Sequence, residues 1–200
     1  MSEKIIALVG NPNTGKTTFF NTVAKTEEHV GNWHGVTVDY KEKKLKGKGN
    51  TPFILTDLPG AYSLSSYSYE EAVTRDYLLN NKQENISVIS LCDANNLERN
   101  LLLTIELMEM GLSPIICINM ANELKKTGKQ IDVKKLEKML GLKVFLINAQ
   151  NKSETEQVIK CALINENKSQ QKNLPYLQKI VEIFDKNNLQ KYCDNLDIFF

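Results

Sequence analysis

A glycine-rich loop close to the N-terminus constrains the fold of this chain more than any other feature. Residues 10–17 read GNPNTGKT, which matches the pattern GxxxxGK[ST] in full, and they follow an apolar, β-branched run. Glycines let the backbone turn so that successive N–H groups face one anion, and the dipole of a following helix favours negative charge. We therefore expect a phosphate-binding loop between a buried strand and a helix. The residues expected to bind a nucleotide here are Gly10, Asn11, Pro12, Asn13, Thr14, Gly15, Lys16, Thr17 and Thr18.

Segments typical of strands and of helices alternate around and beyond this loop. The strand patterns lie at residues 4–9, 36–46, 51–56, 86–92, 114–119 and 142–147, the second and third flanking a hairpin turn. The helical patterns lie at residues 16–25, 69–80, 97–110, 132–140 and 154–165, and loop formers fill residues 26–35 and 57–68. This alternation predicts an α/β fold in which helices flank a mostly parallel, six-stranded sheet.

The alternating pattern ends before the chain does. We predict one nucleotide-binding domain at residues 1–165, a polar linker at 166–173 and a partial helical segment at 174–200. In that last segment, apolar side chains fall on one helical face, which is expected to pack on the first domain or on another chain. These side chains are Leu174, Leu177, Ile180, Val181 and Phe184.

Composition narrows the classes of protein that this chain can represent. The net charge is +1 over 200 residues, so a nucleic acid is not an expected partner. No apolar run approaches the length of a membrane span, and residues 1–4 lack the layout of a signal peptide, so we expect a cytoplasmic start. The four cysteines have neither CxxC nor zinc spacing and are expected to be reduced. We see no Fe²⁺ or Zn²⁺ site in the sequence.

Two further motifs favour a GTPase of the Ras-like kind over an ATPase. Asp57 begins the sequence DLPG after a predicted strand and fits the DxxG pattern, in which the aspartate holds Mg²⁺ and the N–H of Gly60 senses the γ-phosphate. Thr37 lies where the loop after the first predicted helix meets the second predicted strand, a place at which a threonine closes over Mg²⁺ in the triphosphate state of GTPases. The predicted Mg²⁺ ligands are therefore Thr17, Thr37 and Asp57, and Lys16 is expected to reach the outer phosphates.

These motifs together resemble one family. The loop GNPNTGKT, the segment VGNWHGVTV at residues 30–38 and DLPGAYSL at residues 57–64 look like the cytoplasmic G domain of the FeoB ferrous iron transporters. Asn119, Met120 and Asn122 belong to NMAN, which resembles the base-recognition motif NMxD of that family. The resemblance covers most of residues 1–160.

The resemblance implies further site residues. It implies a K⁺ ion held by Asn13 and by backbone carbonyls near Gly31 and Trp33. With the phosphate and Mg²⁺ motifs, the expected catalytic residues are Asn13, Lys16, Thr37 and Gly60. The resemblance also implies that backbone N–H groups of Asn148, Ala149 and Gln150 support the base. Ala61 stands where Ras-like proteins carry a water-orienting glutamine, which is compatible either with slow, cation-assisted hydrolysis or with binding alone.

Asn122 departs from the family pattern, which ends in aspartate. Asparagine offers one acceptor and one NH₂ group, so facing guanine one contact would fail, whereas the 2-oxo group of xanthine would suit it. We therefore expect weakened guanine binding and a relative preference for xanthine nucleotides. In the alternative, Glu123 supplies the carboxylate after a shift of one residue.

Three functional hypotheses remain open on the sequence. The first is a slow GTPase that gates or regulates iron uptake with a FeoB-type membrane domain, in the parent protein or in trans, on the cytoplasmic side of the membrane. The second is a module that binds nucleotide with little hydrolysis. The third is an Era-like, RNA-associated GTPase, although no basic RNA-binding domain is visible. Self-association is possible in each case.

Overall fold

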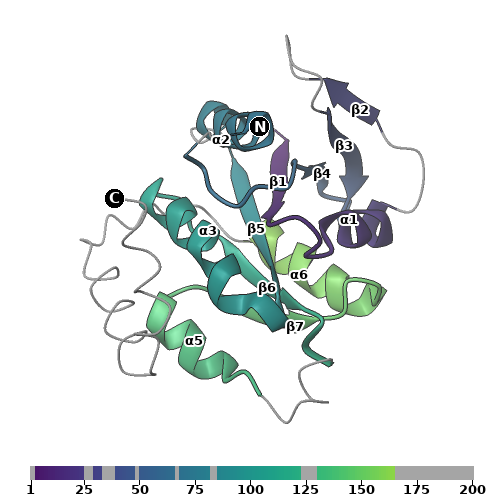
Figure 1. Ribbon diagram of the computed structural model, residues 1–200. Coiled ribbons are helices and arrows are strands. Elements are labelled where there is room, and N and C mark those ends of the chain that lie inside the picture. Colours follow the sequence, from purple (N-terminus) through teal and green to yellow (C-terminus); the bar gives the residue numbers. More distant parts are fainter. Residues whose placement is uncertain are drawn as a thin grey trace. The chain divides into compact units, whose positions relative to one another are not determined.

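A single mixed sheet forms the centre of the computed structural model (Figure 1). The structure describes residues 3–24, 29–32, 39–47, 50–65, 68–81, 85–122 and 130–164. Its strands are β1 (Lys4–Gly10), β2 (His29–Asn32), β3 (Asp39–Lys46), β4 (Pro52–Asp57), β5 (Ile86–Asp93), β6 (Ile115–Asn119) and β7 (Val144–Ile147). They are ordered β2-β3-β4-β1-β5-β6-β7. The predicted linker and the segment 174–200 lie outside the described residues.

The sheet is parallel except at one edge. Strands β4, β1, β5, β6 and β7 are parallel neighbours, whereas β3 is antiparallel to both β2 and β4. The predicted hairpin is therefore present as β3 and β4. Strand β2 adds a seventh strand to the six expected, in a segment that we expected to be a loop. Its four residues pair through the backbone, which requires no alternation of apolar side chains and so leaves no pattern in the sequence.

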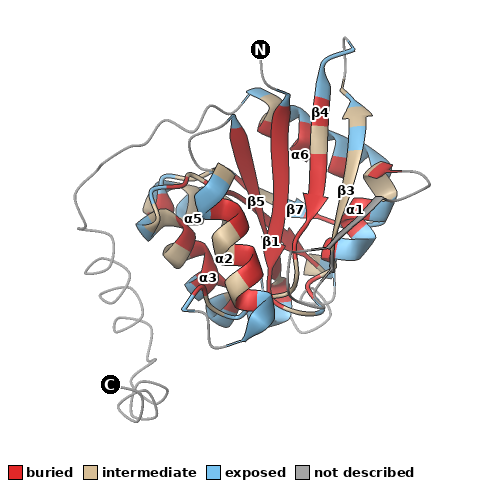
Figure 2. Ribbon diagram, turned by 90° about the horizontal axis from the view of Figure 1, so that it is seen from above, coloured by how far each residue is buried: buried red, intermediate tan, exposed pale blue. Residues whose placement is uncertain are grey.

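Helices cover both faces of the sheet. They are α1 (Lys16–Ala24), α2 (Tyr69–Asn81), α3 (Leu97–Glu109), α5 (Val133–Leu140) and α6 (Lys152–Ile164), with a short 3₁₀ turn, η1 (Ala94–Asn96), before α3. Apolar side chains of α1 and α6 pack on one face, and those of α2 and α3 pack on the other. In Figure 2, β1 and β5 are buried along almost their whole length, as expected for central strands between two helical layers.

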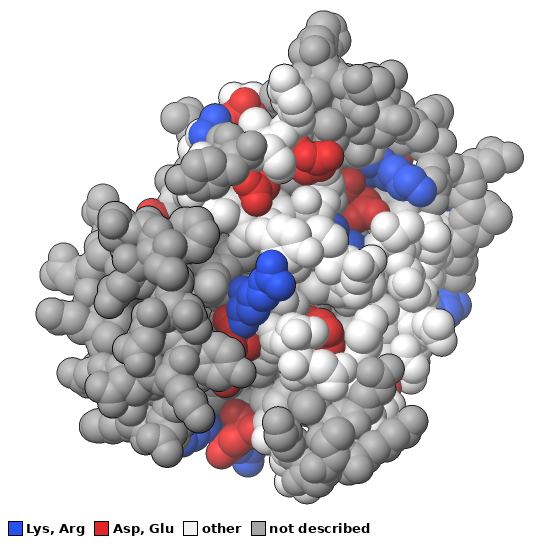
Figure 3. Space-filling view, in the orientation of Figure 1, with Lys and Arg blue, Asp and Glu red and all other residues white. Residues whose placement is uncertain are grey.

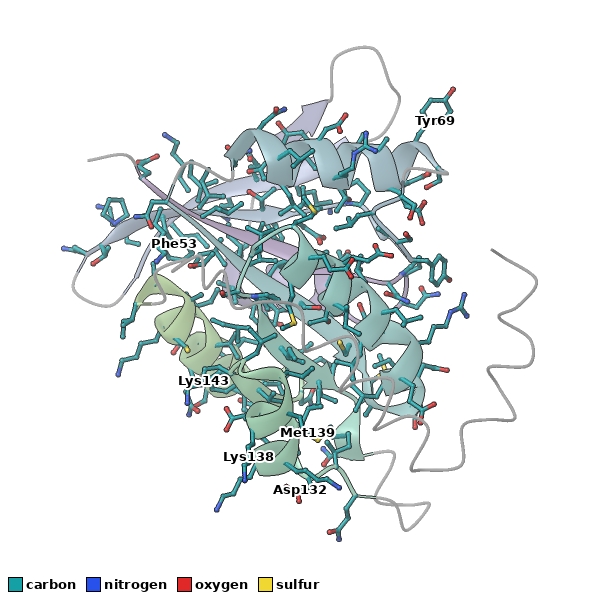
Figure 4. All side chains as sticks on the ribbon, turned by 90° about the vertical axis from the view of Figure 1, so that its left-hand side faces the viewer. Phe53, Tyr69, Asp132, Lys138, Met139 and Lys143 are labelled. Carbon is teal, nitrogen blue, oxygen red and sulfur yellow. The ribbon has the colours of Figure 1, made fainter. Side chains whose placement is uncertain are left out.

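Local sequence signals explain where these helices begin and end. The Asp132 carboxylate accepts the N–H of Lys135 and caps α5, and Gly141 ends the helix with a left-handed φ of 68°. Figure 4 shows Asp132, Lys138 and Met139 along this helix. At α2, Ser68 accepts the N–H of Glu71 and Glu71 accepts the N–H of Ser68, which is a capping box.

The parallel strands direct several loops to the same edge of the sheet. The glycine-rich loop follows β1, DLPG begins at the end of β4, NMAN begins at the end of β6, and residues 148–150 follow β7. Because the carboxyl ends of parallel strands lie together, motifs far apart in the sequence meet at this edge. Among the described residues, no helix is long and apolar enough to cross a membrane.

The packing of α3 against the sheet gives a direct test of the fold. Leu103 is fully buried, whereas its neighbour Leu102 is 50% exposed. We expect Leu103→Ala to lower the free energy of unfolding by about 2–5 kcal/mol, because it leaves a cavity in the core. Leu102→Ala is the matched control and should cost less than about 1 kcal/mol. Urea unfolding followed by circular dichroism measures both, and equal effects would contradict the described orientation of α3.

Candidate nucleotide site

The glycine-rich loop makes a tight turn between β1 and α1. Asn13 and Gly15 have left-handed φ values of 65° and 96°, so the chain reverses direction between the strand and the helix. A Cβ on Gly10 would lie 2.4 Å from the carbonyl oxygen of Leu91, so the loop approaches β5 more closely than any side chain permits. The loop therefore has the conformation that its glycines predict.

Lys16 lies over this loop. Its ammonium donates to the carbonyl oxygens of Gly10 at 3.0 Å and Asn11 at 3.2 Å, and the residue is 8% exposed. Burial lowers the pKa of Lys16, and the nearby Asp57 carboxylate partly opposes that shift. A buried ammonium with this surrounding is suited to bind an anion such as a phosphate.

Two of the predicted Mg²⁺ ligands lie together. The Thr17 hydroxyl at the start of α1 donates to Oδ2 of Asp57 at the end of β4, over 3.0 Å. A hydroxyl and a carboxylate are oxygen ligands of the kind that Mg²⁺ prefers, so this pair fits the ion. Thr37, the third predicted ligand, lies outside the described residues.

The DLPG segment lies against the glycine-rich loop. The N–H of Ala61 donates to the Gly10 carbonyl at 3.3 Å, and a Cβ on Gly60 would lie 3.1 Å from Cγ of Pro12. Gly60 is therefore held close to the turn on which Lys16 lies, as the DxxG pattern predicts.

Asn119 joins the glycine-rich loop to the loop after β7. Its Nδ2 donates to the carbonyl of Thr14 at 3.1 Å, and its Oδ1 accepts the N–H of Ala149 at the same distance. Met120 follows with a left-handed φ of 63°, and Asn122 is exposed. Glu123 lies outside the described residues.

The loop after β7 has its own internal bonds. The N–H of Gln150 donates to Oδ1 of Asn148 at 3.0 Å, and the N–H of Asn148 donates to Glu154 at 2.6 Å. The Ala149 carbonyl accepts the Thr22 hydroxyl of α1 at 2.7 Å, which ties this loop to the helix after the glycine-rich loop. Ala149 is also buried.

The remaining predicted residues are more dispersed. Thr18 is exposed on α1, and Gly31 lies in the edge strand β2, paired with Tyr40. Trp33 lies outside the described residues. On the face shown in Figure 3, acidic and basic side chains of the described residues form small groups among uncharged ones.

Two glutamates that the sequence prediction missed hold the segment after DLPG. Glu71 accepts the backbone N–H groups of Tyr62 and Ser63, and Glu106 on α3 accepts the N–H of Leu64 and the hydroxyl of Ser63. The spacing of Ser68 and Glu71 is a capping-box signal that could have identified Glu71. No local pattern points to Glu106, because its partners lie more than 40 residues away in the sequence.

Comparison with known proteins decides the family. A family model described as ferrous iron transport protein B matches residues 4–162. The chain belongs to the ferrous iron transport protein B family. An FeoB fusion protein, "Fe(2+) transport protein A/Fe(2+) transporter FeoB", from Porphyromonas gingivalis is 47% identical over 137 residues, which cover 68% of this chain and 16% of that protein. This chain spans between 16% and 25% of the length of the first three curated relatives.

Solved structures of FeoB domains have the same fold. NFeoB from S. thermophilus, bound to GDP·AlF₄⁻ and K⁺, is 44% identical with a TM-score of 0.69, and the match covers 83% of this chain and 63% of that one. The G domain of the T. maritima FeoB iron transporter is 37% identical with a TM-score of 0.72, and the match covers 81% of this chain and 98% of that one. The predicted class, a P-loop GTPase of the FeoB family with a Ras-like fold, is therefore confirmed.

The contact between Gly15 and Asn119 gives a test of the site. A Cβ on Gly15 would lie 2.4 Å from Nδ2 of Asn119, so we expect Gly15→Ala to displace the asparagine that joins two loops. Nucleotide affinity should fall at least roughly tenfold, with about 1–3 kcal/mol lost from the free energy of unfolding. The control is Gly141→Ala, which also has a left-handed φ but lies at the end of α5. It should lose stability and keep affinity; unchanged binding by the Gly15 variant would contradict the geometry.

Proposed function

We propose that this chain binds a guanine nucleotide with Mg²⁺ and hydrolyses GTP slowly. The observation that supports this most is the hydrogen bond between Thr17 and Asp57, which lies next to the buried ammonium of Lys16. These groups provide oxygen ligands for a divalent cation and a positive charge for phosphate within one small region.

The proposed reaction is in-line attack of water on the γ-phosphate. The bond between the γ-phosphorus and the bridging oxygen breaks, a bond to the water oxygen forms, and GDP and phosphate leave. Mg²⁺ between Thr17 and Asp57 would supply positive charge beside the phosphate oxygens, with Thr37 as a further proposed ligand. Lys16 would neutralise charge on the outer phosphates, and the N–H of Gly60 would bond the γ-phosphate.

The residue after Gly60 supports slow turnover. Ala61 follows Gly60 and carries no group that could orient the attacking water. A monovalent cation beside the phosphates would compensate in part for the missing charge stabilisation. We propose K⁺ in this role, with Asn13, Gly31 and Trp33 around it, because the similar S. thermophilus domain has been solved with GDP·AlF₄⁻ and K⁺.

The biological role that we propose is regulation of ferrous iron uptake. The curated relatives are Fe(2+) transporters of which this chain spans a small part, so a membrane domain in the parent protein or in trans would carry the iron. The nucleotide domain would then lie on the cytoplasmic side of the membrane. Binding and hydrolysis would alternate two states of the segments around Thr37 and Gly60 and so gate that partner.

The proposed K⁺ site predicts a cation effect on turnover. Phosphate release at saturating GTP and Mg²⁺ should be faster in K⁺ than in Na⁺ at equal ionic strength. Asn13→Gly should remove most of this difference while leaving the slower rate in Na⁺ within about threefold, because glycine adopts the left-handed φ of Asn13 without strain and the variant loses only the proposed cation ligand. An equal rate in both salts for the unaltered chain would contradict the K⁺ proposal, and no turnover in either would favour a module that only binds.

A second candidate function is binding of xanthine nucleotides. Asn119 joins Thr14 to Ala149, which supports the alignment in which Asn119 begins the base-recognition motif. In that alignment the last motif position is Asn122, and we propose that this residue faces the base. Facing guanine, the Asn122 NH₂ group would meet a second donor, whereas xanthine presents an acceptor there.

Asn122→Asp tests this base preference. We expect the variant to bind GDP roughly tenfold more tightly and XDP more weakly, because a donor left unmatched against the bound base costs about 1–3 kcal/mol. Competition against a fluorescent nucleotide measures both affinities. Glu123→Gln is the control: if a shifted register placed Glu123 on the base, this variant would lose GDP affinity, and the proposal for Asn122 would fail.

A further inference from the structure

Three side chains on α2 bond to backbone or side-chain groups beside the nucleotide site. Glu71, Thr74 and Tyr77 are three residues apart, so they follow one another along one side of the helix. Glu71 accepts the N–H groups of Tyr62 and Ser63, at 3.3 and 3.2 Å. The three residues are all buried. Hydrogen bonds therefore attach α2 to the segment after DLPG in addition to apolar packing.

Thr74 attaches the same helix to DLPG itself. Its hydroxyl donates to the carbonyl of Pro59 over 3.2 Å, and this carbonyl belongs to the residue before Gly60. The peptide that carries the Gly60 N–H is formed by that same carbonyl group. The position of α2 therefore influences the donor that is proposed to bond the terminal phosphate.

Tyr77 attaches α2 to the sheet. Its hydroxyl donates to Oε1 of Glu42 on β3 at 2.8 Å and lies 2.9 Å from the hydroxyl of Thr56 on β4, which in turn donates to Glu42 at 3.2 Å. Glu42 and Thr56 are directly opposite each other in the register of the two strands. Burial is the main cause that raises the pKa of Tyr77, so the hydroxyl keeps its proton and remains a donor. The ring also packs edge-on against Tyr40, with centroids 5.4 Å apart.

The bonded side chains of Tyr77, Glu42 and Thr56 lie close in sequence to residues proposed for the site. Thr56 immediately precedes Asp57, the proposed Mg²⁺ ligand, and β3 begins at Asp39, two residues after Thr37 in the sequence. The same helix thus has polar contacts with β3, with β4 and with the DLPG segment.

We infer that Tyr77 is a positioning residue that enables the site to distinguish a nucleoside triphosphate from a diphosphate. Its hydroxyl fixes α2 on β3 and β4, and α2 fixes Gly60 through Thr74. This inference rests on the proposed function, because it concerns how that same site binds the γ-phosphate. The glycine-rich loop holds the α- and β-phosphates without α2, so loss of the Tyr77 hydroxyl should weaken only the contact to the γ-phosphate.

Tyr77→Phe tests the inference, because it removes the hydroxyl and keeps the ring. The measurement is the ratio of the affinities for GMPPNP and GDP, each titrated as a fluorescent derivative in Mg²⁺ and K⁺. We expect the ratio to fall roughly three- to tenfold while GDP affinity stays within about twofold of the unaltered chain. Glu42→Gln keeps an acceptor oxygen for Tyr77 and should cause a smaller decrease.

Two controls separate positioning from general loss of stability. Thr104→Val removes another buried hydroxyl, which lies on α3 at 2.8 Å from the hydroxyl of Ser90 on β5, and it should lower the melting temperature without changing the ratio. Tyr69→Phe removes a hydroxyl from the 71% exposed tyrosine that begins α2 and projects outward in Figure 4, and it should change neither quantity.

The outcomes distinguish this inference from the proposed function. If the unaltered chain binds neither nucleotide, the proposed function fails. If it binds them and Tyr77→Phe keeps the same ratio, the inference is overturned and the function stands. A ratio that falls equally in Thr104→Val would also overturn it, because the effect would then follow stability and not the contact with Glu42.

Discussion

A buried ammonium is the constraint on which the rest of this site depends. Lys16 is almost fully removed from water, and two loop carbonyls and a nearby carboxylate offset only part of the cost of burying its charge. Such an arrangement requires the tight turn at Gly10 to Gly15, since only that turn directs the carbonyls toward the ammonium. It also favours an anion with several oxygens as a ligand. The parallel sheet supplies the remaining groups, because β4 and β6 end at the same edge as β1.

The sequence predicted those parts of the site that depend on local chemistry. The turn after β1 needs glycine at fixed positions, and Asp57 follows a strand pattern, so spacing alone locates both. Strand β2 was not predicted, because backbone pairing at an edge places no demand on side-chain pattern. Glu106 was also missed, since its contact with Ser63 depends on how α3 packs and on no motif. The ends of the helices in the structure differ from the predicted ends by one or two residues, as expected where capping groups decide them.

Asn119 and Asn122 show how a structure can limit the interpretation of a motif. Each is an asparagine in the same four-residue segment, but only Asn119 has described bonds to two other loops. These bonds support the alignment of the motif in which Asn122 is the residue proposed to face the base. A substitution at an exposed position such as Asn122 changes what the site can recognise more readily than whether the domain folds. The proposed change of base preference at Asn122 is therefore compatible with an unchanged fold.

The polar contacts of α2 explain how a small change at the phosphates could reach a distant partner. Apolar packing holds a helix at a given depth but permits it to slide, whereas hydrogen bonds from Glu71, Thr74 and Tyr77 require particular partners at particular distances. A displacement of Gly60 must therefore either break one of these bonds or move the helix as a whole. Breaking a bond would leave buried polar groups unpaired, which is costly. Movement of α2 as a unit, with its exposed residues at Tyr69 and Leu79, is the favoured response and would present a changed surface to the proposed membrane domain.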